Sequence, residues 1–463
     1  MKKLFCAVCL FALVLSCAGC TVPVPPAQNA QDGGAGMPAP PPAVSGAAAG
    51  AAPGAEASSA EASSAGASSG GAAETPIRYL GQGEPLGDGN EAGYYYLSHR
   101  EDGSFNIKYV DYASCTEIYL CSRPECAHDN ESCTAWRPYG GSEGCAVPVG
   151  DHLYTMFYGP LRPEELAVFG ELAKMHIEIS GLDGSGAREL VSLPASESLH
   201  DGIAADAQHL YMTIETVEKI EDDGTRYFRQ IYAVDLQDGS ISKSAPMEQN
   251  NLGIVGAAGR KLILRYYDVT LDETHSLADM GDVYCTYDVD TGELHALTGS
   301  VPAGYICAGE YLCRIDREQA CLQKMNVLTG ETVSLPFGRD LSRYEDIRPS
   351  CSAMPDYILI LLYEPDQPVQ HGLLSLETGE IFLRTMEIEA PEGSHDKTAP
   401  IFAQIDEKTF LTARSYANRV VQFPLGDGGA LGLPYPEYEL ALLPVESCLA
   451  NRPDFTPIQK VGP

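Results

Sequence analysis

A repeated phrase constrains the fold of this chain more than any other feature of its sequence. A polar turn is followed by an apolar or aromatic strand start, and the third residue of each copy is Leu153, Leu210, Leu262, Leu312, Ile358 and Thr409. Successive copies are 57, 52, 50, 46 and 51 residues apart. A period of this length indicates an array of similar supersecondary units, each of which buries its hydrophobic faces against its neighbours.

A second phrase lies between the copies of the first and marks tight turns. Short apolar strands end in the pairs Asp183-Gly184, Asp238-Gly239, Thr291-Gly292, Thr329-Gly330, Thr378-Gly379 and Asp427-Gly428. Glycine supplies the positive φ that such hairpin turns require. Each unit therefore reads as four short antiparallel strands, as in residues 202–247, and this is the pattern of a β-propeller blade.

These units predict an all-β domain, a β-propeller of seven blades that runs from residues 94–120 to residues 409–433. The first and last units are the least regular, so six or eight blades are the alternatives. A β-sandwich array is the rival fold, but its repeats would normally be longer. Because an exposed edge strand invites aggregation, we expect residues 77–80 or 438–443 to complete a blade. One helix is expected, at residues 163–173, as a loop insertion.

The N-terminus predicts export and lipidation. Two lysines precede an apolar run at residues 4–15, which is too short to span a bilayer because about 20 apolar residues are needed. A charged start, a short apolar core and then small residues indicate a signal peptide at residues 1–19. The segment that ends at Cys20 resembles the lipobox of bacterial lipoproteins, whose cysteine is acylated. Cys20 follows the usual small Ala-Gly pair, whereas Cys17 follows Leu15-Ser16, so Cys20 is the predicted acceptor. An ordinary cleaved signal is the alternative.

The segment at residues 20–74 begins with this cysteine and continues almost entirely as Ala, Gly, Ser and Pro. Such a composition cannot bury a core that offsets the entropy of ordering, so the sequence predicts a disordered tether. A flexible coil of about 54 residues spans roughly 40 Å on average. A glycosylated stalk is an alternative interpretation of its serine-rich part. The propeller domain then occupies residues 75–463.

A cysteine-rich insert at residues 121–133 carries the pattern C-x4-C-x-H-x4-C, formed by Cys121, Cys126, His128 and Cys133. Three thiolates and one imidazole can hold one structural zinc or iron ion in a tetrahedral site. Outside the membrane, however, neighbouring cysteines commonly form disulfides. Cys115 and Cys145 flank the insert, and a disulfide between them together with the metal site would use all five local cysteines. Metal and disulfides remain open alternatives, and both predict a structural staple.

The turn phrases and the unit lengths resemble those of the TolB-like propellers found outside the bacterial cytoplasm. Residues 120–135, LCSRPECAHDNESCTA, resemble more closely the insert of a group of propeller lipoproteins from anaerobic Firmicutes. The resemblance covers most of residues 75–433. It implies a β-propeller with an extracytoplasmic location, and it implies no mechanism because that group has no established activity.

The net charge and the absence of known catalytic motifs reduce the range of functions that the sequence allows. The chain has 64 acidic and 30 basic residues, a net charge of −34, so nucleic acids and anionic lipid head groups are excluded as partners. The sequence contains no nucleophile elbow, phosphate-binding glycine loop or paired-histidine metal motif, and it predicts no catalytic residue. We therefore expect a binding or scaffold module for an extracellular ligand or protein, lipid-anchored at the extracytoplasmic face of the cell membrane. A propeller lyase or hydrolase that acts on an extracellular polymer is the alternative.

Overall fold

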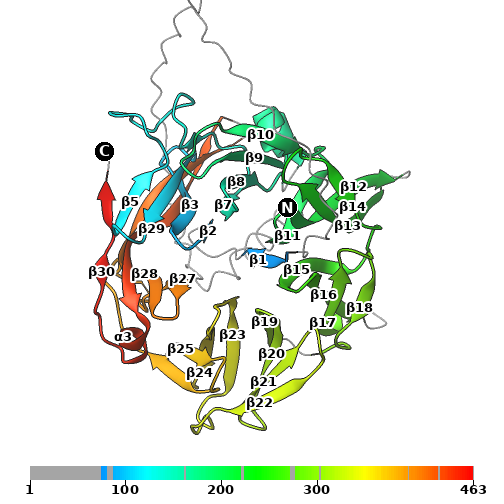
Figure 1. Cartoon of the computed structure of the whole chain (residues 1–463), viewed down its shortest axis with the longest axis vertical. Helices are drawn as coiled ribbons and strands as arrows, with labels where there is room; N and C mark the ends of the chain where they lie inside the picture. The colour runs from blue at the N-terminus through cyan, green and yellow to red at the C-terminus, as the bar shows by residue number, and fades with distance from the viewer. Residues whose placement is uncertain are drawn as a thin grey trace, which may run out of the picture. The chain divides into compact units, whose positions relative to one another are not determined.

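The computed structural model describes residues 75–80, 87–160, 163–220, 224–271, 277–301, 304–394, 396–425 and 428–461. These residues form seven β-sheets that surround a common axis (Figure 1). The predicted signal peptide, Cys20 and the predicted tether lie outside the described residues. Within the ranges that are described, no helix is long and apolar enough to cross a membrane.

Five of the sheets have one plan, in which four strands follow one another in chain order. The earliest in the chain consists of β7 (Gly144–Val149), β8 (His152–Phe157), β9 (His176–Gly181) and β10 (Arg188–Ser192). Two further sheets are β15 (Asn250–Ala258), β16 (Lys261–Leu271), β17 (Leu277–Asp288) and β18 (Leu294–Ala296), and then β19 (Tyr305–Ala308), β20 (Tyr311–Asp316), β21 (Cys321–Asn326) and β22 (Thr332–Pro336). The last two are β23 (Asp346–Ala353), β24 (Tyr357–Tyr363), β25 (Gln370–Ser375) and β26 (Ile381–Arg384), and then β27 (Ile401–Asp406), β28 (Thr409–Pro424), β29 (Ala430–Pro444) and β30 (Thr456–Pro457).

The other two sheets are larger, because each holds one end of the described chain. One contains β11 (Glu197–Ala205), β12 (His209–Ile220), β13 (Gly224–Asp235) and β14 (Ile241–Lys243), with the N-terminal β1 (Arg78–Leu80) beside β11. The other, called the first blade below, contains β2 (Gly87–Gly89), β3 (Gly93–His99), β4 (Phe105–Asp111), β5 (Thr116–Tyr119), β6 (Trp136–Arg137) and the C-terminal β31 (Gln459–Val461).

The prediction of an all-β propeller is confirmed. The prediction of seven blades with one four-stranded plan is wrong, because five sheets have that plan and the two sheets with the chain ends do not. The repeat period could not reveal this difference, since β1 and β31 are three-residue strands that belong to sheets distant in sequence. The predicted helix is confirmed as α2 (Pro163–Phe169), followed by the 3-10 turn η1 (Gly170–Ala173), and α3 (Val445–Leu449) was not predicted.

The ring is closed by a strand that the sequence did not suggest. Both expected segments belong to blades: residues 78–80 add a fifth strand beside β11, and residues 438–443 lie in β29, the third strand of the last blade (β27–β30). The strand that was not expected is β31, which runs parallel to β5 with Lys460 opposite Glu117. Parallel pairing from a distant part of the chain carries no hairpin signal, and the sequence pattern therefore missed it.

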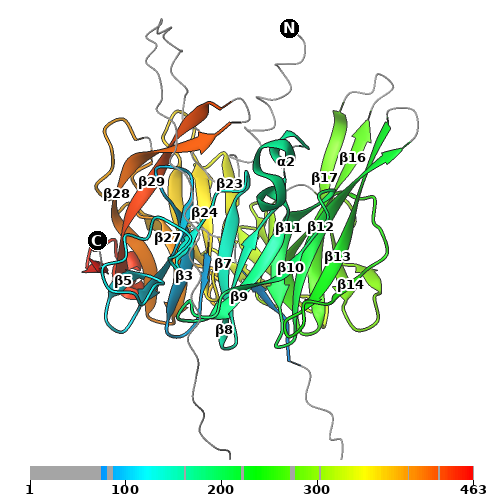
Figure 2. The ribbon, with the colours of Figure 1, turned by 90° about the horizontal axis from the view of Figure 1, so that it is seen from above.

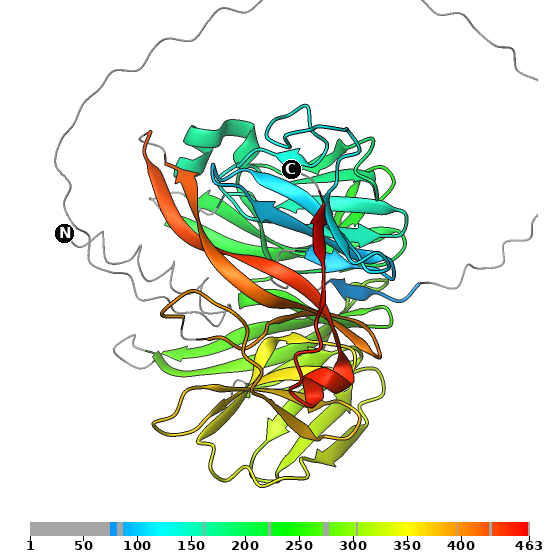
Figure 3. The same cartoon turned by 90° about the vertical axis from the view of Figure 1, so that its left-hand side faces the viewer.

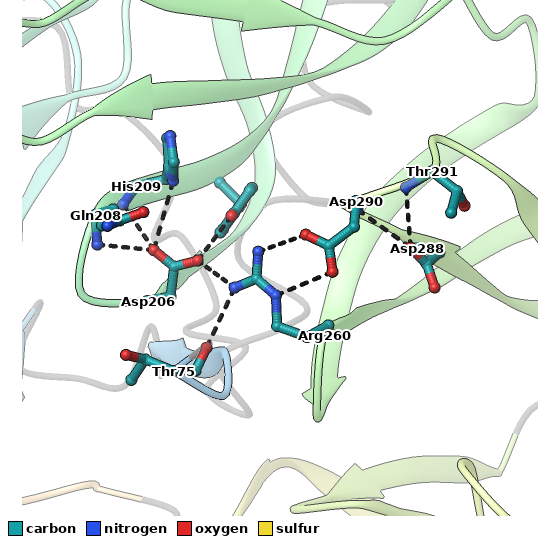
Figure 4. A network of polar contacts seen from close by, with 9 residues as sticks. Thr75, Asp206, Gln208, His209, Arg260, Asp288, Asp290 and Thr291 are labelled. Carbon is teal, nitrogen blue, oxygen red and sulfur yellow. Dashed lines mark hydrogen bonds and ion pairs between the residues drawn. The ribbon is translucent and has the colours of Figure 1, made fainter. Parts of the chain in front are cut away.

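The ring has two distinct faces. The tether face is the one on which Thr75 meets the turns after β11 and β15: the amide of Ile77 donates to the carbonyl of Gly259 at 2.8 Å, and Arg260 donates to the carbonyl of Thr75 at 3.2 Å (Figure 4). The hairpin face lies opposite, and the long hairpins β12–β13, β16–β17 and β28–β29 extend from it together with α2 (Figures 2 and 3).

Asp206 organises the tether face. Its carboxylate accepts hydrogen bonds from the amides of Gln208 and His209, each at 2.8 Å, from the hydroxyl of Tyr211 at 2.9 Å, and from Arg260 (Figure 4). Burial raises the pKa of Asp206, but the bonds from Arg260 and the other donors outweigh burial and hold this pKa below its ordinary value. The carboxylate is therefore ionised and links the N-terminal segment to two neighbouring sheets.

The turns between the third and fourth strands contain predicted glycines, and these glycines have positive φ values. Gly239, Gly292 and Gly330 each have a φ of 74°. In the turn after β17, Asp288 accepts hydrogen bonds from the amides of Asp290 and Thr291, both at 3.1 Å (Figure 4). A side chain at these glycine positions would force an L-residue into the left-handed region, which explains why the repeat keeps glycine there.

We expect Asp206→Asn to lower the free energy of unfolding by about 2 kcal/mol near neutral pH, because the ionised carboxylate with its donors is lost. A group whose pKa is lowered on folding stabilises the protein above its unfolded pKa, and this stabilisation disappears as the pH falls through the folded pKa. The difference in unfolding free energy between the wild type and the variant should therefore decrease at low pH. Urea unfolding followed by circular dichroism at about pH 7 and about pH 3 measures both effects.

Asp235→Asn is the matched control. Asp235 accepts hydrogen bonds from the amides of Gln237 and Asp238 in the turn between β13 and β14, and its carboxylate has no arginine partner among the described residues. If both variants lower the free energy of unfolding equally, Arg260 contributes nothing to the stability of the tether face.

Candidate metal centre

The cysteine-rich insert is a closed loop on the first blade. It leaves β5 at Leu120 and returns at Ala135, immediately before β6. The carbonyl of Ile107 in β4 accepts from the amide of Leu120 at 3.0 Å, and the amide of Ile107 donates to the carbonyl of Ala135 at 2.8 Å. One residue of the sheet therefore holds both ends of the insert.

Within this loop the four predicted ligands converge. One ligand atom from each of Cys121, Cys126, His128 and Cys133 can be chosen so that all four lie within 4.8 Å of one another. Zinc with Zn–S bonds of about 2.3 Å separates two sulfur ligands by roughly 3.8 Å in a tetrahedron, so this spacing suits a four-coordinate ion. The residues fit a structural zinc or iron site, and metal binding there stays a prediction.

The backbone must reverse twice to bring these residues together. Glu125 and His128 have φ values of 57° and 53°, in the left-handed region that few residues other than glycine adopt. The amide of Cys133 then donates to the carbonyl of Asn130 at 2.9 Å. Strain of this kind persists where the surroundings determine the conformation, and here it directs His128 toward the cysteines.

His128 is held from three directions. Its ring stacks on Tyr119 with the centroids 4.2 Å apart, and its Nδ1 lies 3.2 Å from the sulfur of Cys133. Its carbonyl accepts from Arg100 at 2.9 Å and from Asn106 at 2.8 Å. Burial, assisted by the nearby positive charges of Arg100 and Arg123, lowers the pKa of His128, and the neutral imidazole is the form that binds metal.

The thiols of the insert have unequal proton affinities. Burial raises the pKa of Cys121, but hydrogen bonds from the Arg123 amide and from Thr134 outweigh it and bring the pKa to about 6. Burial raises the pKa of Cys133 to about 11. The side chain of Arg123 donates to the sulfur of Cys126 at 3.2 Å. One thiolate is thus favoured in the metal-free protein, and a bound cation would favour ionisation of the other two.

The structure contains no disulfide among the cysteines whose side chains it describes, and the disulfide alternative stays a prediction. All the cysteines that the structure describes with their side chains are free thiols. Cys115 contributes to the hydrophobic cluster where the first and last blades meet, whereas Cys145 contributes to the cluster between β7–β10 and β11–β14. The two flanking cysteines therefore belong to different clusters, and no bridge joins them.

The four candidate ligands were predicted from the sequence, whereas the residues that support them were not. Arg123 lies inside the insert, and a cation among thiols is a signal that could have identified it. Arg100, Asn106 and Tyr119 belong to β strands or their turns and carry no signal of their own, because their role arises when β4 and β5 place them beside His128.

Two hollows flank the insert. One, of about 270 Å³, is bordered by Tyr119, Arg123, His128 and Val461. The other, of about 350 Å³, is bordered by Tyr119 together with charged side chains of the first and last blades. Tyr119 therefore separates the candidate metal centre from a second site.

No protein-family model and no curated protein matches the chain. Among solved structures, a puromycin-hydrolyzing peptidase of Mycobacterium tuberculosis is similar with a TM-score of 0.45 and 10% identity, over 83% of this chain and 53% of that chain. This chain thus spans about half the length of that peptidase. TolB from Acinetobacter baumannii gives a TM-score of 0.30 and 14% identity, over 75% of this chain and 80% of that chain. The β-propeller domain of the Trilobed protease from Pyrococcus furiosus gives a TM-score of 0.35 and 13% identity, over 61% of this chain and 75% of that chain.

We expect protein purified without oxygen to contain about one zinc or iron ion per chain. His128→Ala and Cys126→Ser should lose the ion, whereas Cys115→Ser, a change in the same blade outside the cluster, should retain it. Metal affinity should fall as the pH falls, because protons compete for the thiolates and the imidazole. Elemental analysis and a competitive chelator titration measure the stoichiometry and the affinity.

Thiol counting on the same samples decides between the alternatives. A metal-free protein whose insert cysteines are oxidised in pairs would establish the disulfide staple. A metal-free protein whose insert thiols react freely in the folded state would exclude both forms of the staple.

Proposed function

We propose that this chain is a lipid-anchored extracytoplasmic β-propeller that binds a ligand or partner on its hairpin face, with one structural zinc ion in its insert. The observation that carries the proposal is the division of the ring into two faces. The chain joins the ring at Thr75 on the tether face, and the extended hairpins occupy the other. A lipid on Cys20 would thus be connected to the tether face.

Exposed apolar side chains support a binding role for the hairpin face. The described residues include thirteen exposed large apolar side chains. Eight of them lie in the long hairpins or in the connections between the second and third strands of their sheets: Val168, Leu172, Tyr227, Met280, Val369, Val420, Leu425 and Leu431. Exposed large apolar side chains in these segments offer apolar contacts to a partner. The strongly acidic remainder of the chain keeps such a surface soluble.

The insert would support this role as a metal cross-linked loop that is held against β4. Four protein ligands complete the coordination of a zinc ion, which leaves no open position for a substrate. When bound, the ion would supply the positive charge that neutralises the thiolates. The chain itself would then hold the insert against β4 through Ile107, and would hold His128 through Arg100 and Asn106.

The alternative function, a propeller lyase or hydrolase, requires an acid/base pair that a substrate can reach. His99 and Glu143 form a candidate pair, with Nε2 and Oε2 2.9 Å apart. The ring of His99, however, lies between Phe105 and Tyr435 at centroid distances of 4.4 and 4.5 Å, and the His99 side chain is 5% exposed. This pair is therefore better interpreted as a polar link between β3 of the first blade and the residue that precedes β7, and binding is favoured over catalysis.

Cys20→Ala should abolish lipidation, since the acyl chain requires the cysteine thiol. In a host that processes lipoproteins, we expect the wild-type chain to sediment with membranes and Cys20→Ala to be soluble or to remain unprocessed. Cys17→Ala is the control and should behave as wild type. Mass spectrometry of the mature N-terminus identifies the modified residue, and an unmodified wild-type N-terminus would refute the lipid anchor.

A further inference from the structure

A polar hollow of about 350 Å³ lies where the first and last blades meet, on the hairpin face. The amide of Gln422 in β28 donates to the carbonyl of Glu101 at 2.8 Å, so the long hairpin β28–β29 is joined to the turn after β3. Charged side chains border the hollow: Arg100, Glu101, Asp102, Lys108, Arg419 and Glu437. Its volume is within the range of small-molecule sites.

The charges around this hollow balance one another. The Nζ of Lys108 lies 2.8 Å from Glu117, and Arg100 lies 3.9 Å from Asp102. Glu437 lies 3.2 Å from Lys460 of the closing strand β31. An ionic ligand of either sign would have to compete with these internal partners, and both signs of charge border the site. The arrangement therefore favours a neutral ligand.

The same walls offer hydrogen-bonding groups of both kinds. Carboxylates of Glu101, Asp102 and Glu437 can accept, and the guanidinium groups of Arg100 and Arg419 can donate. In addition, three buried nitrogens on these walls have no hydrogen-bond partner among the described residues: His99 Nδ1, Arg100 Nε and Arg419 Nε. Buried polar groups are usually paired, so the two arginine Nε–H groups can donate to a further acceptor, and Nδ1 of the neutral His99 ring can accept from a further donor. A hydroxyl group both donates and accepts, which suits a site with interspersed donors and acceptors.

We propose that this hollow binds a neutral polyhydroxylated ligand, a carbohydrate, through the carboxylates and guanidinium groups of the first and last blades. The inference rests on the proposed function, since it assigns a ligand class to the hairpin face. The insert contacts residues that form one wall of the site. Arg100 and Asn106 border the hollow and donate to the His128 carbonyl, and Tyr119 borders it and stacks on the His128 ring. Metal at the insert would thus hold this wall in place.

The test uses the full mature chain with its bound metal and three neutral disaccharides, cellobiose, maltose and N,N′-diacetylchitobiose. Saturation-transfer NMR titrations give the affinity of each at concentrations up to about 10 mM, above the millimolar range of weak binding. We expect at least one disaccharide to bind, and Glu437→Gln to weaken that binding about tenfold or more, because a charged hydrogen bond is lost. Removal of the metal by a chelator should weaken it as well.

Glu439→Gln is the matched control. Glu439 lies two residues further along β29 and lies 2.9 Å from Arg414, outside the hollow, so its substitution should leave the affinity unchanged. Citrate and spermidine serve as anionic and cationic probes. The proposal is overturned if none of the disaccharides binds, if citrate or spermidine binds more tightly than all of them, or if Glu437→Gln and Glu439→Gln behave alike. Membrane sedimentation is measured separately, so a lipidated protein that binds no sugar refutes this site and leaves the anchor intact.

Discussion

The structure depends on the burial of every sheet between two neighbours. A sheet of four short strands exposes two faces and two edges, and it gains stability when adjacent sheets cover its faces. The first and last sheets of a linear array lack one neighbour each, so they must meet. Here Tyr94 and Val110 of the first blade pack with Leu411 and Leu440 of the last in one cluster, and Ile458 completes it. Closure of the ring is therefore a requirement of hydrophobic burial.

The site of closure also collects the polar features of the molecule. The parallel pairing of β31 with β5 places Lys460 near Glu437, and the hairpin β28–β29 brings Arg419 to the carbonyl of His99. The insert projects from the same blade. The candidate metal centre and the polar hollow are neighbours because both are built on the junction, where residues more than 300 positions apart in the chain come into contact.

The insert shows how a small segment without a core of its own acquires a defined shape. Thirteen residues cannot bury enough apolar area to offset the entropy of ordering them, and small segments of this kind normally need a metal or disulfides. The ends are held at Ile107, but the two left-handed residues, Glu125 and His128, require further support. A cation among the thiols would provide it, and would favour the ionised thiols that burial disfavours.

The all-β repeat, the glycine turns and the four candidate metal ligands could be predicted from the sequence alone. Each of these is a local property: a strand alternates, a turn needs a positive φ, and a ligand set is recognised by residue type and spacing. The closure of the ring, the two sheets with more than four strands, the placement of Cys115 and Cys145 in different clusters, and the support of His128 by Arg100 and Tyr119 became visible only in the folded chain. These features depend on contacts between distant segments, and such contacts arise from the mutual packing of sheets, which leaves no periodic or compositional trace in the chain.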